Sequence, residues 1–247
     1  MVRQLMDLTV EMLDPHGPVY GPGPGAAGPG VVIVHGGEGP MAGWSHRFAV
    51  ILAAHGFRAL PISYGEGDFF AAGPIRDVPL EGLSDAISAL AAHTGTGEIG
   101  AFGWSRGAEK LALLASYLAS TQPLAAVALH AGPDRVHSAF DPAAFRTGQG
   151  GLETDSAAPA AWTWRGQPVT PGADIAIEHF PGPVFLSVGD ADDVWDPRMT
   201  FRLADRLATA GRPADLLVGK GQGHGYAFDR EPELWVRLTA FFSKHLS

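Results

Sequence analysis

The sequence predicts an α/β fold with a mostly parallel, doubly wound sheet, and three observations lead to this prediction. Short apolar segments rich in β-branched residues alternate with longer segments of helical periodicity along most of the chain. The apolar segments, such as Val31–His35, are continuous, which is typical of strands buried on both faces of a parallel sheet. Strands that alternate with helices favour right-handed crossovers that place helices on both faces. The chain has 247 residues, and we expect residues 1–247 to form a single domain.

The expected elements follow one another regularly after a short N-terminal strand. Leu8–Leu13 alternates polar and apolar residues and is predicted to be an edge strand. The Gly- and Pro-rich segment Pro15–Gly30 is predicted to be a hairpin or surface loop, because only a short strand precedes it. The strands expected after it are Val31–His35, Arg58–Ile62, Ile99–Phe102, Leu124–Leu129, Val184–Val188 and Ala214–Val218. The expected helices are Ser45–His55, Leu80–His93, Ser105–Ala119, Pro197–Ala210 and Pro232–His245.

One stretch interrupts this alternation between two of the predicted strands. Residues 131–182 contain many Gly and Pro residues together with Trp162 and Trp164. A structureless loop of this length is uncommon inside a compact domain. We therefore expect an insertion over the carboxyl edge of the sheet, where open α/β proteins bind their ligands. The two tryptophans could form the wall of an acyl pocket or the core of the insertion.

Composition and charge restrict the classes of partner. The chain carries 17 Lys and Arg against 26 Asp and Glu, a net charge of −9, and its cations are scattered along the sequence. Nucleic acids and anionic membranes bind clustered cations, so we expect neither as a partner. No segment approaches the roughly 20 apolar residues that span a bilayer. The N-terminal segment contains Asp7 and Glu11 and does not resemble a signal peptide, which favours a cytoplasmic location.

The cysteine and histidine content narrows the chemistry. The chain contains no cysteine, which excludes disulfides, thiolate metal sites and a cysteine nucleophile. Its 10 histidines show no H-x-x-x-H pair or comparable spacing on one predicted helix, so a zinc site is not expected. We expect no cofactor. The sequence leaves the oligomeric state open.

The segment Gly103-Trp104-Ser105-Arg106-Gly107 carries the main chemical signal. It matches the pattern G-x-S-x-G and lies between a predicted strand and a predicted helix. A serine hydroxyl is a weak nucleophile and needs an exposed position beside a base and hydrogen-bond donors. A sharp strand-to-helix turn provides that position, and glycines two residues to either side remove the side chains that would clash. The alternative is a glycine-flanked serine that caps a helix. The strand–turn–helix context favours Ser105 as a nucleophile and an α/β-hydrolase fold.

Two backbone N–H groups are candidates for an oxyanion hole. The N–H of Arg106 follows the serine at the start of the predicted helix, where the helix dipole favours negative charge. The loop His35-Gly36-Gly37 ends the first buried strand, and Gly37 is the expected source of the second N–H. The alternative is an ordinary glycine turn. The imidazole of His35 is expected to be structural.

The base and the acid are expected on loops after the last two strands. The order Ser, Asp, His is required along the chain in this fold. His224 lies in a Gly-rich loop after the last strand and is the candidate base. Three aspartates follow Val184–Val188, namely Asp190, Asp192 and Asp193. Asp190 is expected to cap the turn and Asp193 to face solvent, so Asp192 is favoured as the acid.

Two further residues near the predicted site have less specific signals. Glu109 lies one helical turn beyond Ser105 on a largely buried helix, where a carboxylate needs a partner. It is expected to hold a neighbouring loop rather than to act in catalysis. His130 ends a predicted strand on the same side of the sheet and could line the pocket.

Several segments of the chain resemble known families. The segments VVIVHGGEGP, AFGWSRGAEKLALLAS, AWTWRGQPVTP and PGPVFLSVGDADDVW resemble the C-terminal catalytic domain of acyl-CoA thioesterases and bile acid-CoA:amino acid N-acyltransferases. That family carries Ser at the turn in the hydrolases and Cys in the acyltransferases, so the resemblance implies a hydrolase with Ser105. It also places the acid at Asp192. The loop GQGHGYAFD is more similar to dienelactone hydrolases, which use Cys at the same turn.

These residues predict acyl transfer from an ester, lactone or thioester to water through an acyl-enzyme on Ser105. Transfer of the acyl group to an amine or alcohol is an alternative that needs the same geometry. A non-catalytic binding protein on the same fold is a second alternative. The negative net charge offers little to hold the phosphates of coenzyme A, so we expect small esters or lactones to be better substrates than acyl-CoA thioesters.

Overall fold

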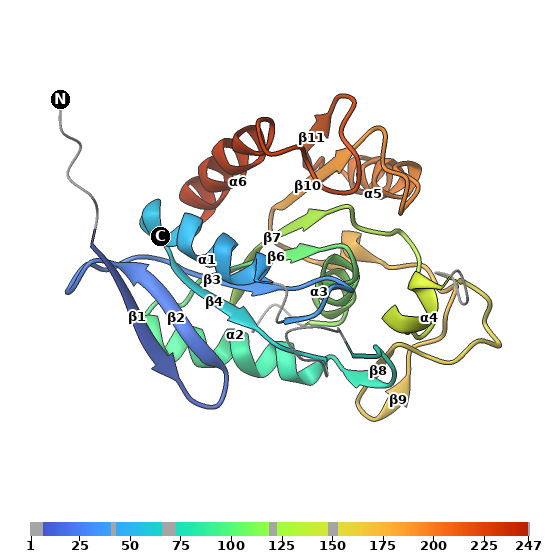
Figure 1. Cartoon of the computed structure of the whole chain (residues 1–247), viewed down its shortest axis with the longest axis horizontal. Coiled ribbons are helices and arrows are strands. Elements are labelled where there is room, and N and C mark those ends of the chain that lie inside the picture. Colours follow the sequence, from blue (N-terminus) through green and yellow to red (C-terminus); the bar gives the residue numbers. More distant parts are fainter. Residues whose placement is uncertain (1–6, 41–42, 66–72, 119–122, 148–152, 247) are drawn as a thin grey trace.

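The computed structural model describes residues 7–40, 43–65, 73–118, 123–147 and 153–246. Within these ranges eight strands form one sheet in the order β1-β2-β4-β3-β6-β7-β10-β11 (Figure 1). The pairings β1–β2 and β2–β4 are antiparallel, and every pairing from β4 to β11 is parallel. The predicted mostly parallel sheet is therefore confirmed. The strands are β1 (Leu8–Leu13), β2 (Gly17–Pro22), β3 (Gly30–Val34), β4 (Arg58–Ile62), β6 (Ile99–Trp104), β7 (Leu124–His130), β10 (Val184–Gly189) and β11 (Asp215–Gly219).

Helices cover both faces of this sheet, as the alternation of segments predicts. The apolar side chains of α1 (Trp44–Ala54) and α6 (Glu231–His245) form one core with one face of the sheet. Those of α2 (Glu81–Thr94), α3 (Arg106–Tyr117) and α5 (Arg198–Thr209) belong to a second core. Among the helices of the described ranges, none is long and apolar enough to cross a lipid bilayer.

Strand β2 is the main difference from the predicted elements. The sequence predicts a hairpin or loop over Pro15–Gly30, and the structure contains a hairpin whose second strand is Gly17–Pro22. This strand resists prediction because Gly and Pro occupy four of its six positions. It pairs with β4 at Tyr20 and Ala59, and Val19 is almost fully buried. Burial of Val19 and Pro22 and the pairing with β1 define the strand, and neither has a strong local signal.

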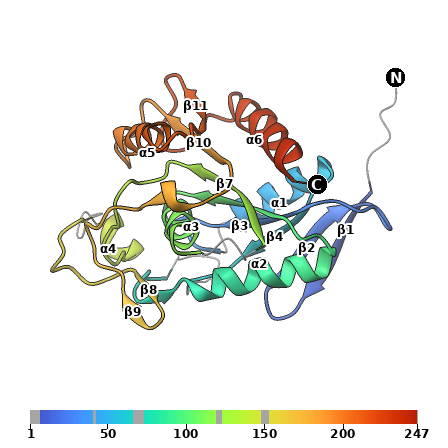
Figure 2. The ribbon, with the colours of Figure 1, turned by 180° about the vertical axis from the view of Figure 1, so that it is seen from behind.

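The predicted insertion is confirmed and has its own secondary structure. It contains α4 (Pro142–Arg146), β8 (Trp162–Trp164), β9 (Gln167–Pro168) and the 3-10 helix η2 (Ile177–His179). Strand β8 pairs with β9 and with β5 (Val78–Pro79), a short strand that precedes α2. The two ribbon views show α4, β8 and β9 at the end of the molecule opposite the β1–β2 hairpin (Figures 1 and 2).

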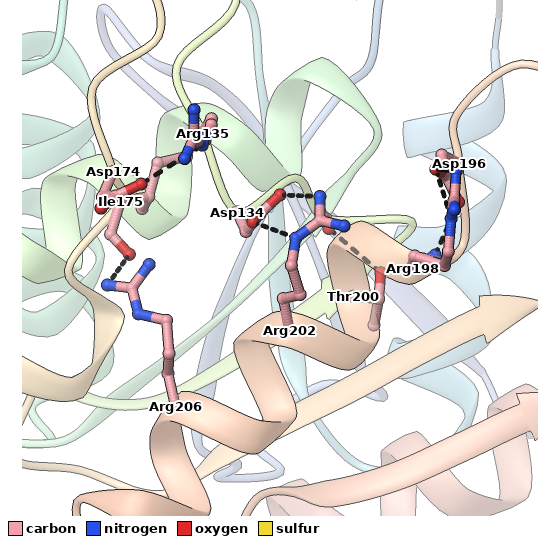
Figure 3. A network of polar contacts seen from close by, with 10 residues as sticks. Asp134, Arg135, Asp174, Ile175, Asp196, Arg198, Thr200, Arg202 and Arg206 are labelled. Carbon is pink, nitrogen blue, oxygen red and sulfur yellow. Dashed lines mark hydrogen bonds and ion pairs between the residues drawn. The ribbon is translucent and has the colours of Figure 1, made fainter.

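Arginines on α5 attach the insertion to the sheet domain (Figure 3). The guanidinium of Arg202 forms two hydrogen bonds with the carboxylate of Asp134, at 2.5 and 2.7 Å. Arg206 donates to the carbonyl of Ile175 at 2.9 Å and pairs with Glu178 at 2.7 Å. These arginines are four residues apart, so they lie on one face of the helix. Two successive segments of the insertion therefore contact the same helix face.

Candidate functional site

Ser105 occupies a strained turn between β6 and α3. Its backbone has φ 55° and ψ −119°, outside the regions that non-glycine residues usually adopt. A Cβ atom on Gly103 would lie 2.6 Å from the carbonyl oxygen of Gly107, and one on Gly107 would lie 2.3 Å from that of His35. Neither position can accept a side chain. The two glycines therefore permit the close approach of strand, turn and helix that the sequence predicts.

Backbone hydrogen bonds hold this turn. The N–H of Ser105 donates to the carbonyl of His130 at 2.9 Å, and its carbonyl accepts from the N–H of Glu109 at 3.1 Å. The serine is 7% exposed. Its hydroxyl makes no hydrogen bond with another residue in the described ranges. The strained backbone is the feature expected of a nucleophile turn, whereas activation of the hydroxyl needs a hydrogen bond to a base, and the described residues form no hydrogen bond between Ser105 and His224.

Asp192 and His224 lie in contact on neighbouring loops. Asp192 follows β10 and His224 follows β11, and these parallel strands place both loops at the carboxyl edge of the sheet. The Oδ2 atom of Asp192 is 2.8 Å from Nδ1 of His224. The other carboxylate oxygen, Oδ1, accepts the N–H groups of Val194 and Trp195, each at 2.9 Å. The Asp192 side chain is fully buried, whereas that of His224 is 18% exposed.

This contact determines which ring nitrogen of His224 can act as a base. Burial alone would raise the pKa of Asp192, but the hydrogen bond from His224, the charge of that ring and the two backbone N–H groups lower it from its ordinary value. An ionised carboxylate only accepts hydrogen bonds, so the proton of a neutral His224 lies on Nδ1. Nε2 then carries the lone pair that can take a proton from a serine.

The other two aspartates of the same loop have different surroundings. Asp190 accepts the N–H of Gly221 at 2.6 Å and forms an ion pair with Lys220 at 3.1 Å. It therefore joins the β10 loop to the β11 loop, a cross-loop contact rather than the turn cap predicted. Asp193 is exposed, and the side chain of Trp195 is buried. Of the three candidates, Asp192 is the one whose carboxylate contacts His224.

The buried side chain of His130 contacts the backbone of the loop that carries His224. Its Nε2 lies 3.0 Å from the carbonyl oxygen of His224, and its Nδ1 lies 2.8 Å from Oγ of Ser187. Burial lowers the pKa of His130 to about 4, so the ring is neutral near pH 7. A carbonyl only accepts, so Nε2 carries the proton and Nδ1 accepts from the Ser187 hydroxyl. Its ring also stacks on Trp104 with centroids 4.1 Å apart. The sequence predicts a pocket-lining role for His130 and gives no signal for this contact with a loop 94 residues away.

One expected oxyanion donor, Arg106, directly follows Ser105, and the loop of the other, Gly37, reaches the serine through Gly36, where an added Cβ would lie 3.1 Å from the Cβ of Ser105. Arg106 is the first residue of α3, and no carbonyl of its own helix can accept its N–H. Gly37 follows β3, and the N–H of its neighbour Gly36 donates to Oε1 of Glu38 at 2.9 Å. A Cβ on Gly37 would lie 2.9 Å from the ring of Phe140, which belongs to the insertion. The insertion therefore reaches the predicted oxyanion loop.

A cavity of about 370 Å³ opens beside His224. Its volume falls in the range of about 300 to 1,000 Å³ that is typical of small-molecule sites. The residues that line the cavity are Glu38, Trp44, Phe48, Trp104, His224, Gly225, Tyr226, Phe228 and Glu231. The sequence does not predict most of them as site residues, because aromatic residues on α1 and in the C-terminal loop have the pattern of ordinary core positions.

Glu109 holds the insertion from inside the molecule. It is completely buried and lies 2.8 Å from the guanidinium of Arg106. Its Oε1 accepts the N–H of His137 at 2.7 Å and the indole N–H of Trp162 at 3.0 Å. Trp162 is completely buried in the hydrophobic core, while Trp164 stacks on Tyr117. The partners of Glu109 thus come from its own helix and from two segments of the insertion, as its predicted loop-holding role requires.

The sequence of the chain also matches a known protein family. Residues 77–247 match the model of the prolyl oligopeptidase family. The chain belongs to that family. Its fold is that of a serine hydrolase in the α/β-hydrolase superfamily, as the serine turn predicts. No curated protein matches the chain.

Solved structures with the same fold share little sequence with this chain. A candidate dienelactone hydrolase from Klebsiella pneumoniae is 18% identical, with a TM-score of 0.67 over 98% of this chain and 100% of its own. A carbohydrate esterase from gut microbiota is 18% identical, with a TM-score of 0.63 over 92% and 89%. A puromycin-hydrolysing peptidase from Mycobacterium tuberculosis is 20% identical, with a TM-score of 0.62 over 98% of this chain and 40% of its own. The dienelactone hydrolase-like features expected from the His224 loop are confirmed at the level of the fold.

Proposed function

We propose that this protein is a serine hydrolase that cleaves small acyl esters, lactones or thioesters through an acyl-enzyme on Ser105. The contact between Asp192 and His224 at 2.8 Å, on the loops expected for acid and base, carries the proposal. The strained backbone of Ser105 at the strand–helix turn supports it. In this proposal Ser105 is the nucleophile, His224 the general base and Asp192 the acid.

The proposed reaction has two acyl-transfer steps. Nε2 of His224 takes the proton of Ser105 as its oxygen attacks the carbonyl carbon, and the N–H groups of Gly37 and Arg106 stabilise the oxyanion. His224 then gives that proton to the departing alcohol or thiol, which leaves an acyl-enzyme. A water molecule deprotonated by His224 attacks the acyl-enzyme, the bond from the acyl carbon to Oγ breaks, and His224 returns the proton to Ser105 as the carboxylic acid product is released. Asp192 stabilises the imidazolium in both steps.

Peptide hydrolysis is the second candidate, and family membership favours it. The chain belongs to the prolyl oligopeptidase family, and one structural neighbour is a puromycin-hydrolysing peptidase. The same three side chains can cleave an amide, which differs in its leaving group. The two activities would use the same catalytic residues. Assays with ester and peptide substrates are therefore needed to distinguish them.

Active-site labelling tests the proposal directly. A fluorophosphonate probe should label wild-type protein at Ser105, as read by peptide mass, and should not label Ser105→Ala. Loss of the nucleophile should lower kcat by a factor on the order of 10⁶, as in a well-studied serine protease, while the melting temperature stays close to that of wild type. Ser116→Ala, on the same helix, is the matched control and should keep both labelling and activity. Full activity in Ser105→Ala would overturn the proposal, and a scaffold protein would remain unlabelled.

A substrate panel separates the remaining alternatives. The panel contains p-nitrophenyl esters, lactones and acyl-CoA thioesters of graded chain length, together with aminoacyl and prolyl peptides. We expect small esters or lactones to have the highest kcat/KM, because the net charge of −9 disfavours the phosphates of coenzyme A. Addition of an amine or alcohol acceptor, with product analysis, distinguishes hydrolysis from acyl transfer. A marked preference for acyl-CoA or for peptides would reject the expected substrate class.

A further inference from the structure

The cavity beside His224 has aromatic walls and two carboxylates. Phe48 and Trp104 lie at its wall with ring centroids 5.5 Å apart, and Trp44 lies 6.4 Å from Phe48. The carboxylates of Glu38 and Glu231 also line it. Aromatic faces carry negative charge density, so rings and carboxylates together favour a cation.

One of the two carboxylates already has a cation of the protein. Glu231 forms two hydrogen bonds with the guanidinium of Arg47, both at 2.5 Å. That guanidinium lies 5.9 Å from the ring centroid of Trp44 and 5.7 Å from that of Phe228. The outer part of the cavity thus shows how aromatic rings and a carboxylate accommodate a positive charge in this fold.

Glu38 has no such counter-ion among the described residues. Its Oε1 accepts the N–H of Gly36, and no Lys or Arg side chain in the described ranges forms an ion pair with it. Burial raises the pKa of Glu38, although the backbone N–H groups of Gly36 and Glu38 and the charge of His224 lower it. A partly buried carboxylate without a Lys or Arg partner is costly, and a ligand cation would relieve that cost.

We propose that this cavity binds a cationic group of the substrate, such as a substituted ammonium, with Glu38 as its counter-ion and Trp104 and Phe48 as its aromatic wall. The inference rests on the proposed hydrolase function and specifies its substrate class. His224 lies at the same cavity and, in the proposed reaction, delivers a proton to the leaving group. The cation therefore belongs to the leaving group, and amino-alcohol esters are the expected class.

Two esters of the same shape test this assignment. Butyrylcholine and 3,3-dimethylbutyl butyrate differ by a positively charged nitrogen in place of a carbon. Wild-type protein should show a kcat/KM about tenfold higher for butyrylcholine, because a desolvated cation–π contact and a counter-ion together exceed about one factor of ten. Glu38→Gln should lower this ratio severalfold, because the counter-ion is removed while the aromatic wall remains. The ratio cancels any general loss of activity in the variant.

A charge-matched control and a binding measurement complete the test. Glu233→Gln removes an exposed carboxylate of α6 outside the cavity and should keep the wild-type ratio. Tetramethylammonium chloride should produce a saturable change in tryptophan fluorescence of wild-type protein that sodium chloride does not produce, and Glu38→Gln should weaken this binding about tenfold. This measurement needs no catalysis and decides the inference even where Glu38→Gln does not fold.

The outcomes separate this inference from the proposed function. Equal hydrolysis of both esters by wild type, an equal loss of both activities in Glu38→Gln, or absence of saturable tetramethylammonium binding overturns the cationic site. Absence of phosphonate labelling at Ser105 and of all ester hydrolysis instead counts against the proposed function.

Discussion

Two buried carboxylates, Asp192 and Glu109, lie in different regions of the molecule and have different kinds of partner. Asp192, in the loop after β10, contacts a histidine ring that is partly exposed and has a second nitrogen free to accept a proton. Glu109, on α3, contacts a guanidinium, an indole and a backbone N–H that are all buried. The difference shows that burial of a carboxylate does not by itself indicate catalysis, since a reactive group needs a partner that remains accessible.

The largest expected effect that sharpens this comparison is on Asp192. Asp192→Asn removes the charge that stabilises the imidazolium and favours the wrong tautomer of His224. It should lower kcat by about 10⁴, as the equivalent change does in a serine protease. Hydrolysis assays of Asp190→Asn, Asp192→Asn and Asp193→Asn under one set of conditions measure this effect. A larger loss in Asp190→Asn or Asp193→Asn would transfer the acid to that position.

Removal of the other carboxylate should act on stability instead. Glu109→Gln leaves the guanidinium of Arg106 buried without a negative partner, which should cost about 3–5 kcal/mol of the free energy of unfolding. Urea unfolding of this variant and of wild type measures the cost. The kcat of the folded variant should fall far less than that of Asp192→Asn. An unchanged midpoint with a collapse in kcat would show that Glu109 acts in catalysis.

Acid pH should lower the free energy of unfolding through two buried histidines, His130 and His35. Burial lowers the pKa values of His130 and His35 to about 4, whereas an unfolded chain has histidine pKa values near 6.5. Between these values the unfolded chain binds protons that the folded protein does not, so stability present above about pH 6.5 is lost as the pH falls toward about 4. Each histidine should contribute up to about 1.4 kcal/mol per pH unit.

Urea unfolding between about pH 7 and about pH 4.5 measures this loss. His130→Gln should unfold with a smaller pH dependence than wild type, because one titrating group is removed. His55→Gln, at the end of α1, is the control and should retain the wild-type dependence. An identical pH dependence in all three proteins would contradict the assignment of a neutral His130.

The smallest expected effect concerns the arginines that attach the insertion from outside. The Arg202 side chain is half exposed, so water and salt screen its ion pair, although the side chain of its partner Asp134 is buried. Arg202→Ala should therefore destabilise the protein by about 1–3 kcal/mol in urea unfolding, below the cost of Glu109→Gln. A cost equal to that of Glu109→Gln would show that the outer contacts hold the insertion as strongly as the buried cluster does.

Elements with a local signal could be predicted well from the sequence. Most of the parallel strands are apolar over most of their length, so their place in a buried sheet is evident from composition. The turn at Ser105 is evident because two glycines flank a serine between a strand and a helix. Strand β2 was predicted only as part of a hairpin or surface loop, since its glycines and prolines oppose strand formation and pairing with β1 outweighs them.

The sequence by itself determined the sheet, the serine turn and the loops that carry Asp192 and His224, because periodicity and chain order depend on residues close together in the chain. Only the tertiary structure decided which aspartate contacts His224, since three neighbouring aspartates differ in direction rather than in kind. It also decided that His130 supports the His224 loop and that Glu38 shares a cavity with Trp104. These contacts join residues from different strands and helices, and their separation along the chain leaves no local pattern.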